Sequence, residues 1–177
     1  LQPEAFQQCF AEWLNSLIGP AGAKFLSIDG KTLRRSHDGQ HQLGALHLVS
    51  VWANEQGLTL GQVATAEKSN EITAIPLLLD LVDVKGAIVS IDAMGTQKAI
   101  AAKIIDRGGD YVLPVKGNQG NLEQDVKTLL DEALENDFKG MKVSRHHTRE
   151  KHHGRIEQRW YCQINVPQSL RGLKQWK

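Results

Sequence analysis

Two aspartates close short apolar runs that share the tripeptide Ser-Ile-Asp, at residues 27–29 and 90–92. Each run has the alternation of a β-strand, which would put the serine and the aspartate on one face and the isoleucine on the other. If the two strands are parallel neighbours in one sheet, both carboxylates lie at the same edge. Carboxylates held that close repel each other unless a cation lies between them. The pattern therefore indicates a divalent-metal site formed by Asp29 and Asp92.

The metal expected at such a site is Mg²⁺ or Mn²⁺, because both ions prefer carboxylate oxygens as ligands. Two such ions about 3.5–4 Å apart can activate a water or hydroxyl and stabilise the leaving oxygen of a phosphodiester. A site of this kind needs a further acid, and the candidates are Glu123, Asp125 and Glu157. The alternative for Asp29 is a turn or cap role, since it precedes a glycine.

Basic segments accompany the aspartates. Residues 24–35 hold four Lys and Arg against one acid, and residues 142–160 hold six against two acids, with four histidines besides. Basic clusters beside a carboxylate site suit a polyanionic substrate. The side chains predicted to contact phosphates or the DNA backbone are Lys31, Arg34, Arg35, Lys116, Asn118 and Gln119. The alternatives are a solvated loop for the first three and an ordinary Gly-Asn turn for the last three.

Apolar periodicity predicts the elements that must position these residues. Strands are expected over residues 24–29, 45–54, 58–66, 87–92 and 110–115, with the chain turning out of the sheet at Gly30-Lys31. Helices are expected over residues 3–18, from about 70 to 82 with a bend or a late start at Pro76, and over 97–107 and 121–135. A two-stranded ribbon is expected over residues 142–166, turning near His153-Gly154.

Three antiparallel strands followed by helix, strand, helix, strand and helix form an α/β pattern. Right-handed crossovers put the fourth and fifth strands parallel to the first. We therefore predict a ribonuclease H-like mixed five-stranded sheet in the order 3-2-1-4-5, with flanking helices and a C-terminal β-ribbon insertion. That order brings Asp29 and Asp92 next to each other.

The composition, with 41% hydrophobic and 23% charged residues among 177, excludes a disordered chain. Cys9 and Cys162 form no motif, which favours reduced thiols in a cytosolic protein. No apolar run approaches the roughly 20 residues of a membrane span. Trp13 and Trp52 are interpreted as core residues. The ribbon histidines together with Cys162 lack the spacing of a closed zinc site and are interpreted as a polar hairpin.

Four ordered stretches carry a family resemblance: IDGKTLR at 28–34, KSNEI at 68–72, DAMGTQ at 92–97 and LPVKGNQ at 113–119. They resemble the DDE-type transposases of insertion sequences, and most of all the group of H-repeat-associated proteins. The resemblance extends through HGRIE at 153–157. It implies that Asp29 and Asp92 are the first two members of a metal-binding triad, which holds two Mg²⁺ or Mn²⁺ ions in the complete enzyme.

The same resemblance implies metal-dependent cleavage and strand transfer of double-stranded DNA at transposon ends. It also implies a cytoplasmic enzyme that associates with the nucleoid through DNA, has no membrane partner, and forms a homodimer at full length. The third triad member, a glutamate within Ile-Glu-Asn, is absent from this sequence. Glu157 belongs to the β-rich insertion and is only a weak candidate for that ligand. The fragment by itself is therefore expected to be inactive.

Three segments follow from this reading: an N-terminal amphipathic helix at 1–20, a catalytic core at 21–140, and a polar β-rich insertion at 141–177 that begins the missing C-terminal part. Two alternatives keep the fold and change the function. One is a non-catalytic, DNA-binding remnant of a transposase, and the other is a ribonuclease H-like nuclease not involved in transposition. Metal-dependent cleavage of a duplex with terminal inverted repeats would separate transposition from both.

Overall fold

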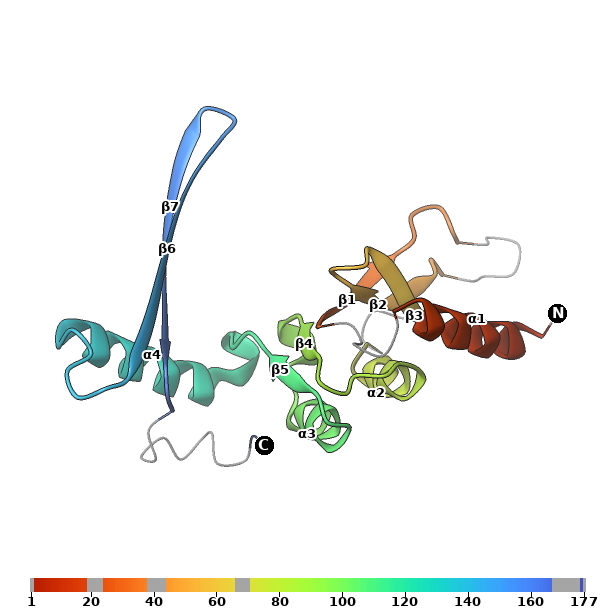
Figure 1. The fold of residues 1–177 in the computed structure, drawn as a ribbon, viewed down its shortest axis with the longest axis horizontal. Helices are drawn as coiled ribbons and strands as arrows, with labels where there is room; N and C mark the ends of the chain where they lie inside the picture. Colours follow the sequence, from red (N-terminus) through yellow and green to blue (C-terminus); the bar gives the residue numbers. More distant parts are fainter. Residues whose placement is uncertain (1, 19–23, 38–43, 66–70, 167–175, 177) are drawn as a thin grey trace. The chain divides into compact units, whose positions relative to one another are not determined.

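A computed structural model of the 177-residue chain describes residues 2–18, 24–37, 44–65, 71–166 and 176. The chain divides into two compact units, Leu1–Asn118 with Trp176–Lys177 and Gln119–Gln175, and each is described by itself (Figure 1). Within the described residues, no helix combines the length and the apolar character needed to cross a bilayer.

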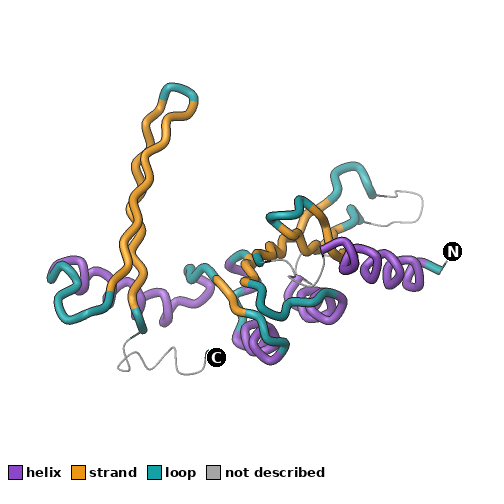
Figure 2. The backbone as a smooth tube through the Cα atoms, in the orientation of Figure 1, coloured by secondary structure: helices purple, strands orange, loops and turns teal. Residues whose placement is uncertain are grey.

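The first unit contains a five-stranded sheet and three α-helices (Figure 2). Its elements in chain order are α1 (Pro3–Ile18), β1 (Phe25–Thr32), β2 (His47–Ala53), β3 (Leu58–Thr65), α2 (Glu71–Leu81), β4 (Ile88–Ile91), the short 3₁₀ helix η2 (Ala93–Gly95), α3 (Lys98–Asp106) and β5 (Asp110–Val112). A further 3₁₀ turn, η3 (Gly117–Gln119), spans the boundary between the first and second units.

The sheet has the order β3-β2-β1-β4-β5. The pairs β1–β2 and β2–β3 are antiparallel, whereas β1–β4 and β4–β5 are parallel. The prediction of a ribonuclease H-like mixed sheet is therefore confirmed. The short strand β5 lies at an edge, where the nearby Pro114 breaks no ladder.

Alternation along the strands gives the sheet one buried face. Leu26 and Ile28 of β1 are buried and Ser27 between them is half-buried, whereas Phe25 before them and Asp29 after them are exposed. The buried face packs on α2 and α3 in one cluster, whose members include Leu26, Val49, Val51, Ile75, Leu78, Leu79, Val89, Ile100 and Ile104. Because burying each such side chain contributes about 1.5–3 kcal/mol, this cluster is the main source of the unit's stability.

Helix α1 packs beside β3, as its amphipathic sequence predicts, but much of its apolar face stays exposed. Leu14 is buried, while Phe10 and Trp13 are 41% and 53% exposed. They line a groove of about 610 Å³ together with β2 and β3 side chains. The interpretation of Trp13 and Trp52 as core residues is wrong: Trp52 lies on the open face of β2 and is 44% exposed.

One predicted element boundary also needs correction, and one alternative for a helix start is excluded. Strand β1 does not leave the sheet at Gly30-Lys31 but continues to Thr32, paired with β2 as far as His47. Helix α2 begins at Glu71, in agreement with the predicted start near residue 70, and runs through Pro76, so the alternative of a late start is excluded. Pro76 lies only about one turn into this helix, where its missing N–H costs a single intrahelical bond.

The second unit contains α4 (Gly120–Glu135) and an antiparallel ribbon of β6 (Val143–His152) and β7 (Arg155–Ile164). Both the acidic helix and the ribbon are confirmed. His153 and Gly154 connect the strands with φ of 48° and 77°. Positive φ at both positions is what a two-residue type I′ hairpin turn requires.

Candidate active site

Asp29 and Asp92 directly follow the last residue pair between two parallel strands. The β1–β4 register runs from Phe25↔Ile88 to Ile28↔Ile91, so the next residue on each strand is an aspartate. Both aspartates are exposed. Adjacent strands lie about 4.8 Å apart, so this register makes the two residues neighbours, although 63 positions separate them in the sequence.

The serines two residues earlier show that the side chains on this face meet across the strands. Ser27 Oγ and Ser90 Oγ lie 3.1 Å apart and form a hydrogen bond. Ser27 also donates to Asn54 Oδ1 at 3.1 Å, which connects the pair to the end of β2. Because side chains two residues apart share a face, Asp29 lies on the same open face as Ser27.

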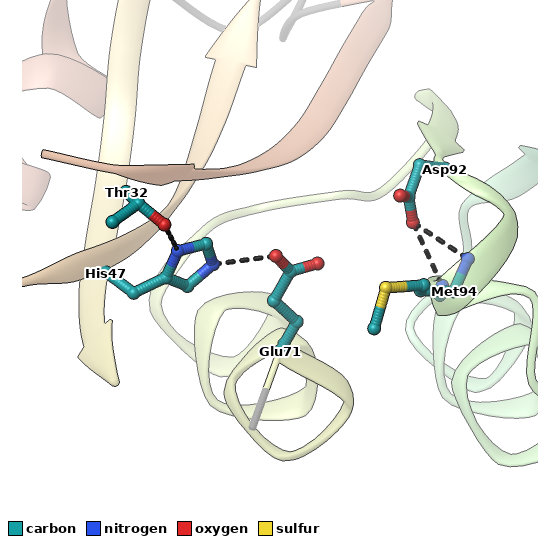
Figure 3. A network of polar contacts seen from close by, with 6 residues as sticks. Thr32, His47, Glu71, Asp92 and Met94 are labelled. Carbon is teal, nitrogen blue, oxygen red and sulfur yellow. Dashed lines mark hydrogen bonds and ion pairs between the residues drawn. The ribbon is translucent and has the colours of Figure 1, made fainter. Parts of the chain in front are cut away.

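The backbone beyond β4 holds the carboxylate of Asp92 in place. Its Oδ1 accepts hydrogen bonds from the backbone N–H groups of Met94 at 2.9 Å and Gly95 at 3.2 Å (Figure 3). Asp92 is thus the N-cap of η2, which satisfies donors that a helix start leaves free. The cap leaves Oδ2 of Asp92 without a hydrogen bond to any described residue.

The two aspartates differ in their backbone support. Asp29 lies inside β1 and pairs with Ser50 of β2. Asp92 lies past the end of β4, where the chain enters η2. The site is therefore formed where β1 continues along β2 while β4 ends. Neither carboxylate forms a salt bridge with a described residue, so the Asp29 oxygens and Asp92 Oδ2 are available to bind a cation or to accept a hydrogen bond from water.

A buried polar network lies on the other side of β1. His47 Nε2 and Glu71 Oε1 are 2.6 Å apart, and His47 Nδ1 is 2.9 Å from Thr32 Oγ1 (Figure 3). The side chains of His47 and Glu71 are only 2% and 5% exposed. An ionised Glu71 can only accept, so Nε2 carries the proton of this bond, and the Thr32 hydroxyl can donate to Nδ1.

Gly30, the residue after Asp29, owes its type to this network. A Cβ at position 30 would overlap Glu71 Oε1 and come within 2.8 Å of His47 Nε2. Glycine therefore allows the buried pair to lie directly against the β1 backbone, next to the candidate site. Sequence reasoning missed the network, although Glu71 lies within the KSNEI stretch and Gly30 within IDGKTLR.

The basic residues after Asp29 lie on and just beyond the end of β1. Lys31 is an exposed residue of β1, and Arg34 and Arg35 form an exposed turn, with Arg35 at a φ of 68°. Ser36 closes the turn: its Oγ donates to Leu33 O at 2.7 Å and accepts from Leu46 N at 2.7 Å. Lys31 shares the open face with Asp29, since the two are two residues apart.

Asn118 has a structural partner beside Asp92. Its amide Nδ2 donates to the carbonyl of Ala93 at 2.5 Å, and Thr96 Oγ1 donates to Pro114 O at 2.8 Å. These bonds attach the segment after β5 to η2. Lys116 is exposed in the same segment, and Gln119 is the first residue of the second unit.

The candidate third acids lie in the second unit. Glu123 pairs with Lys127 at 2.8 Å across one turn of α4, a hydrogen bond that raises the pKa of Lys127. Asp125 is exposed on the same helix, and Glu157 of β7 pairs with Arg159. Among the described residues, no three His, Cys, Asp or Glu side chains form a group that could hold a metal ion.

Two of the ribbon histidines, His146 and His147, pair with aromatic rings. His147 stacks on Trp160 with ring centroids 4.7 Å apart, and His146 lies 6.0 Å from Tyr161. As neighbours on one strand, the two histidines face opposite sides of the ribbon. Cys162, like Cys9, is a free and exposed thiol. The arrangement matches the polar hairpin predicted from the sequence.

Comparison with known proteins supports the resemblance carried by these motifs. Residues 20–169 match the protein family described as transposase DDE domain. The chain is 46% identical to "Putative transposase YncI" of Escherichia coli O157:H7 over 162 residues. This matched region covers 92% of this chain and 41% of that protein.

Two further relatives belong to the predicted group. The chain is 42% identical over 172 residues to "H repeat-associated putative transposase YhhI" of Escherichia coli K12, covering 96% of this chain and 44% of that protein. It is 40% identical over 168 residues to "H repeat-associated putative transposase YbfD" of the same strain, covering 95% of this chain and 65% of that protein. The chain thus spans less than half the length of the first two relatives.

Proposed function

We propose that this chain, which belongs to the family of transposase DDE domains, carries two of the metal-binding carboxylates of a DNA transposase. Asp29 and Asp92 hold divalent metal for cleavage and strand transfer at transposon ends. The observation that supports this most is the parallel β1–β4 register, which makes the two aspartates neighbours.

The donor set fits Mg²⁺ or Mn²⁺. Two exposed carboxylates without a cationic partner among the described residues lie at adjacent strand positions, and hard divalent cations bind such oxygens. A metal pair bound there would lower the pKa of a water or hydroxyl and stabilise the leaving oxygen of the phosphodiester. The backbone of η2 orients the Asp92 carboxylate. Because the Met94 and Gly95 amides hold Oδ1, the direction of Oδ2 is fixed as well.

DNA contacts belong to the same proposal. Lys31 lies on the open face of β1, Arg34 and Arg35 form the turn after this strand, and Lys116 follows β5. Their charges suit the phosphates of a duplex bound across the aspartates. Asn118 and Gln119 complete this set, with Asn118 also holding η2. We further propose a homodimeric full-length enzyme that is cytoplasmic and associates with the nucleoid through DNA.

A non-catalytic DNA-binding role is the second candidate for this chain alone. It is favoured by the lack of a third acid beside Asp29 and Asp92 within the described residues. In that case the chain would bind DNA with a steep salt dependence and would not cut it.

The experiment is cleavage and joining of a duplex with terminal inverted repeats by the full-length protein in Mg²⁺ or Mn²⁺. Asp29→Asn and Asp92→Asn are each expected to lower the rate about a hundredfold or more, since a lost metal ligand forfeits several kcal/mol. Asparagine is chosen because it can still accept the two η2 amides, so Asp92→Asn removes charge and keeps the cap. Activity equal to the parent would show that these residues do not bind the catalytic metals.

A further inference from the structure

The register of the ribbon sorts its side chains into two chemically different faces. The pairs run from Val143↔Ile164 to His152↔Arg155, and directly opposite residues share a face. The face that we term the cationic face carries Arg145, His147, Arg149, Lys151, Ile156, Gln158, Trp160 and Cys162. The mixed face carries His146, Thr148, Glu150, Arg155, Glu157, Arg159 and Tyr161.

The mixed face neutralises its own charge. Glu150 and Glu157 lie directly opposite each other, and Arg159 pairs with both, at 3.7 Å from Glu150. Arg155 supplies a second cation near the turn, so two arginines balance two glutamates on this face. Like charges directly opposite would destabilise the ribbon, so Arg159 has a structural role here, as the counter-charge of both glutamates.

The cationic face has three cations and no acid. Arg145 at its base pairs with Asp137 Oδ1 at 2.5 Å and lies 5.1 Å above the Phe138 ring. Arg149 and Lys151 are exposed, and neither has an ion pair to another residue that the structure describes. They lie two residues apart, about 7 Å along one strand. The uncompensated charge of the ribbon is thus concentrated on the outer half of one face.

An apolar ring lies within this charged face. Trp160 stacks on His147 and remains 69% exposed. Long charged side chains alone would be consistent with a solvated surface. A large exposed aromatic side chain beside two unpaired cations is better suited to a contact surface, because burying it releases water while the cations contact an anion.

We propose that the cationic face of the ribbon binds duplex DNA, with Arg149 and Lys151 on phosphates and Trp160 against the groove wall. Two observations select this occupant. The free charge is positive and unopposed on this face only, and a two-stranded β-ribbon is one of the two elements that the major groove admits. The ten residues of each strand extend about 34 Å, close to one turn of B-DNA.

This inference takes DNA as the partner from the proposed function, but it requires neither metal nor cleavage. It is therefore tested with the 177-residue chain in EDTA, by fluorescence anisotropy of a labelled duplex of arbitrary sequence over about 50–200 mM salt. If Asp29 and Asp92 do not bind metal, DNA binding in EDTA is still expected. If the ribbon does not bind DNA in EDTA, the proposed metal site at Asp29 and Asp92 is still open to the cleavage test.

The test variants remove charge from one face at a time. Arg149→Gln is expected to weaken binding roughly threefold to tenfold at low salt and to reduce the slope of log K against log salt by about one. The double variant Arg149→Gln with Lys151→Gln should reduce the slope by about two. Arg155→Gln, which removes the same charge from the mixed face near the turn, should change affinity less than about twofold.

Two controls decide between outcomes. The swap Arg149→Lys with Lys151→Arg keeps both charges and should bind with the parent's salt slope, which separates loss of charge from loss of the ribbon. Equal weakening by Arg149→Gln and Arg155→Gln would overturn the assignment, because it would mean undirected attraction by net charge. An unchanged affinity of the double variant would overturn it too. Preferential competition by single-stranded DNA would show that the occupant is not the duplex.

Discussion

On the buried face of the sheet, Glu71 and His47 are the residues whose burial most requires a polar partner, because both are ionisable and almost inaccessible to water. Each satisfies the other, with Thr32 bonded to the second ring nitrogen. Removing one member leaves the other buried and unpaired. Among the described residues, no buried side-chain nitrogen or oxygen lacks a hydrogen-bond partner, so this part of the core depends on all three side chains together.

Glu71→Ala is expected to lower the free energy of unfolding by about 3–5 kcal/mol, because it strands His47 in the core. Glu71→Gln keeps an acceptor for His47 and should cost less, about 1–2 kcal/mol. The measurement is equilibrium urea unfolding. Glu135→Ala, at an exposed position of α4, serves as the control and should stay within about 0.5 kcal/mol of the parent. Equal costs for the two alanine variants would contradict the structural role.

Gly30→Ala is expected to destabilise the chain by about 1–3 kcal/mol, because its Cβ would overlap the Glu71 carboxylate. The check is a double-mutant cycle. In a Glu71→Ala background the obstacle is gone, so Gly30→Ala should cost markedly less there than in the parent. Additive costs would mean that the two residues do not compete for the same space.

Sequence reasoning placed the two aspartates at neighbouring strand positions, as the β1–β4 register has them, but it missed this network, and the difference is physical. Asp29 lies in a strand and Asp92 directly after one, and because alternation along a strand is local, counting residues places each aspartate on the face of its own serine. His47 and Glu71 are 24 positions apart, and their contact depends on α2 packing under β2. The one local signal was Gly30, which was interpreted as a strand terminator although the structure needs it for close approach.

At the scale of elements, α2 and α3 are connected by an exposed charge cluster. Lys103 Nζ lies 2.6 Å from Asp80 Oδ2, and Arg107 lies 3.4 Å from Asp80 Oδ1. The hydrogen bond from Lys103, followed by the charges of Lys103 and Arg107, lowers the pKa of Asp80 below its ordinary value. Arg107 also donates to Val82 O at 3.3 Å, at the end of α2.

Asp80→Asn is expected to lower the melting temperature slightly at neutral pH, where the parent carboxylate is ionised and paired. A carboxyl whose folded pKa is depressed contributes stability above its unfolded pKa and loses it as pH falls through the folded pKa. The difference between parent and variant should therefore shrink below about pH 4. Thermal unfolding from pH 7 down to pH 3 measures it, and a difference that stays constant over this range would contradict the pairing.

Elements were predicted well wherever one face is buried and local signals agree. The five strands and the ribbon fall where alternation and turn residues put them, including the turn at His153-Gly154. The end of β1 was misjudged because its last residues pair with β2 alone, beyond the end of β4. The exposure of Trp52 was missed because a tryptophan in an alternating strand resembles a core residue, and the sequence does not show which face is covered.

At the scale of the whole molecule, the buried apolar residues are unevenly divided. The main cluster lies entirely between Leu26 and Ile104 in the first unit. In the second unit the described buried residues are Leu122, Ala133 and Phe138. A two-stranded ribbon with little packing is marginally stable on its own, so the two units should differ widely in local stability.

Hydrogen exchange measures this difference. Amides in the middle of β6 and β7 are expected to exchange at least about a hundredfold faster than those of Val89 and Ile28, because opening the ribbon exposes little apolar surface. Mass spectrometry of peptic fragments resolves the two regions. Equal protection would mean that the ribbon unfolds only with the core. DNA bound to the cationic face should slow the exchange of the ribbon and leave β4 unchanged.

The arrangement of Arg159 between two glutamates has an evolutionary consequence. Because one guanidinium offsets both Glu150 and Glu157, losing it leaves two opposed carboxylates on the narrow ribbon. Losing either glutamate first leaves a tolerable pair. Substitutions at these three positions are therefore expected in a preferred order, with Arg159 the last to change. In an alignment of homologues, the residue types at the three positions should vary together and not independently.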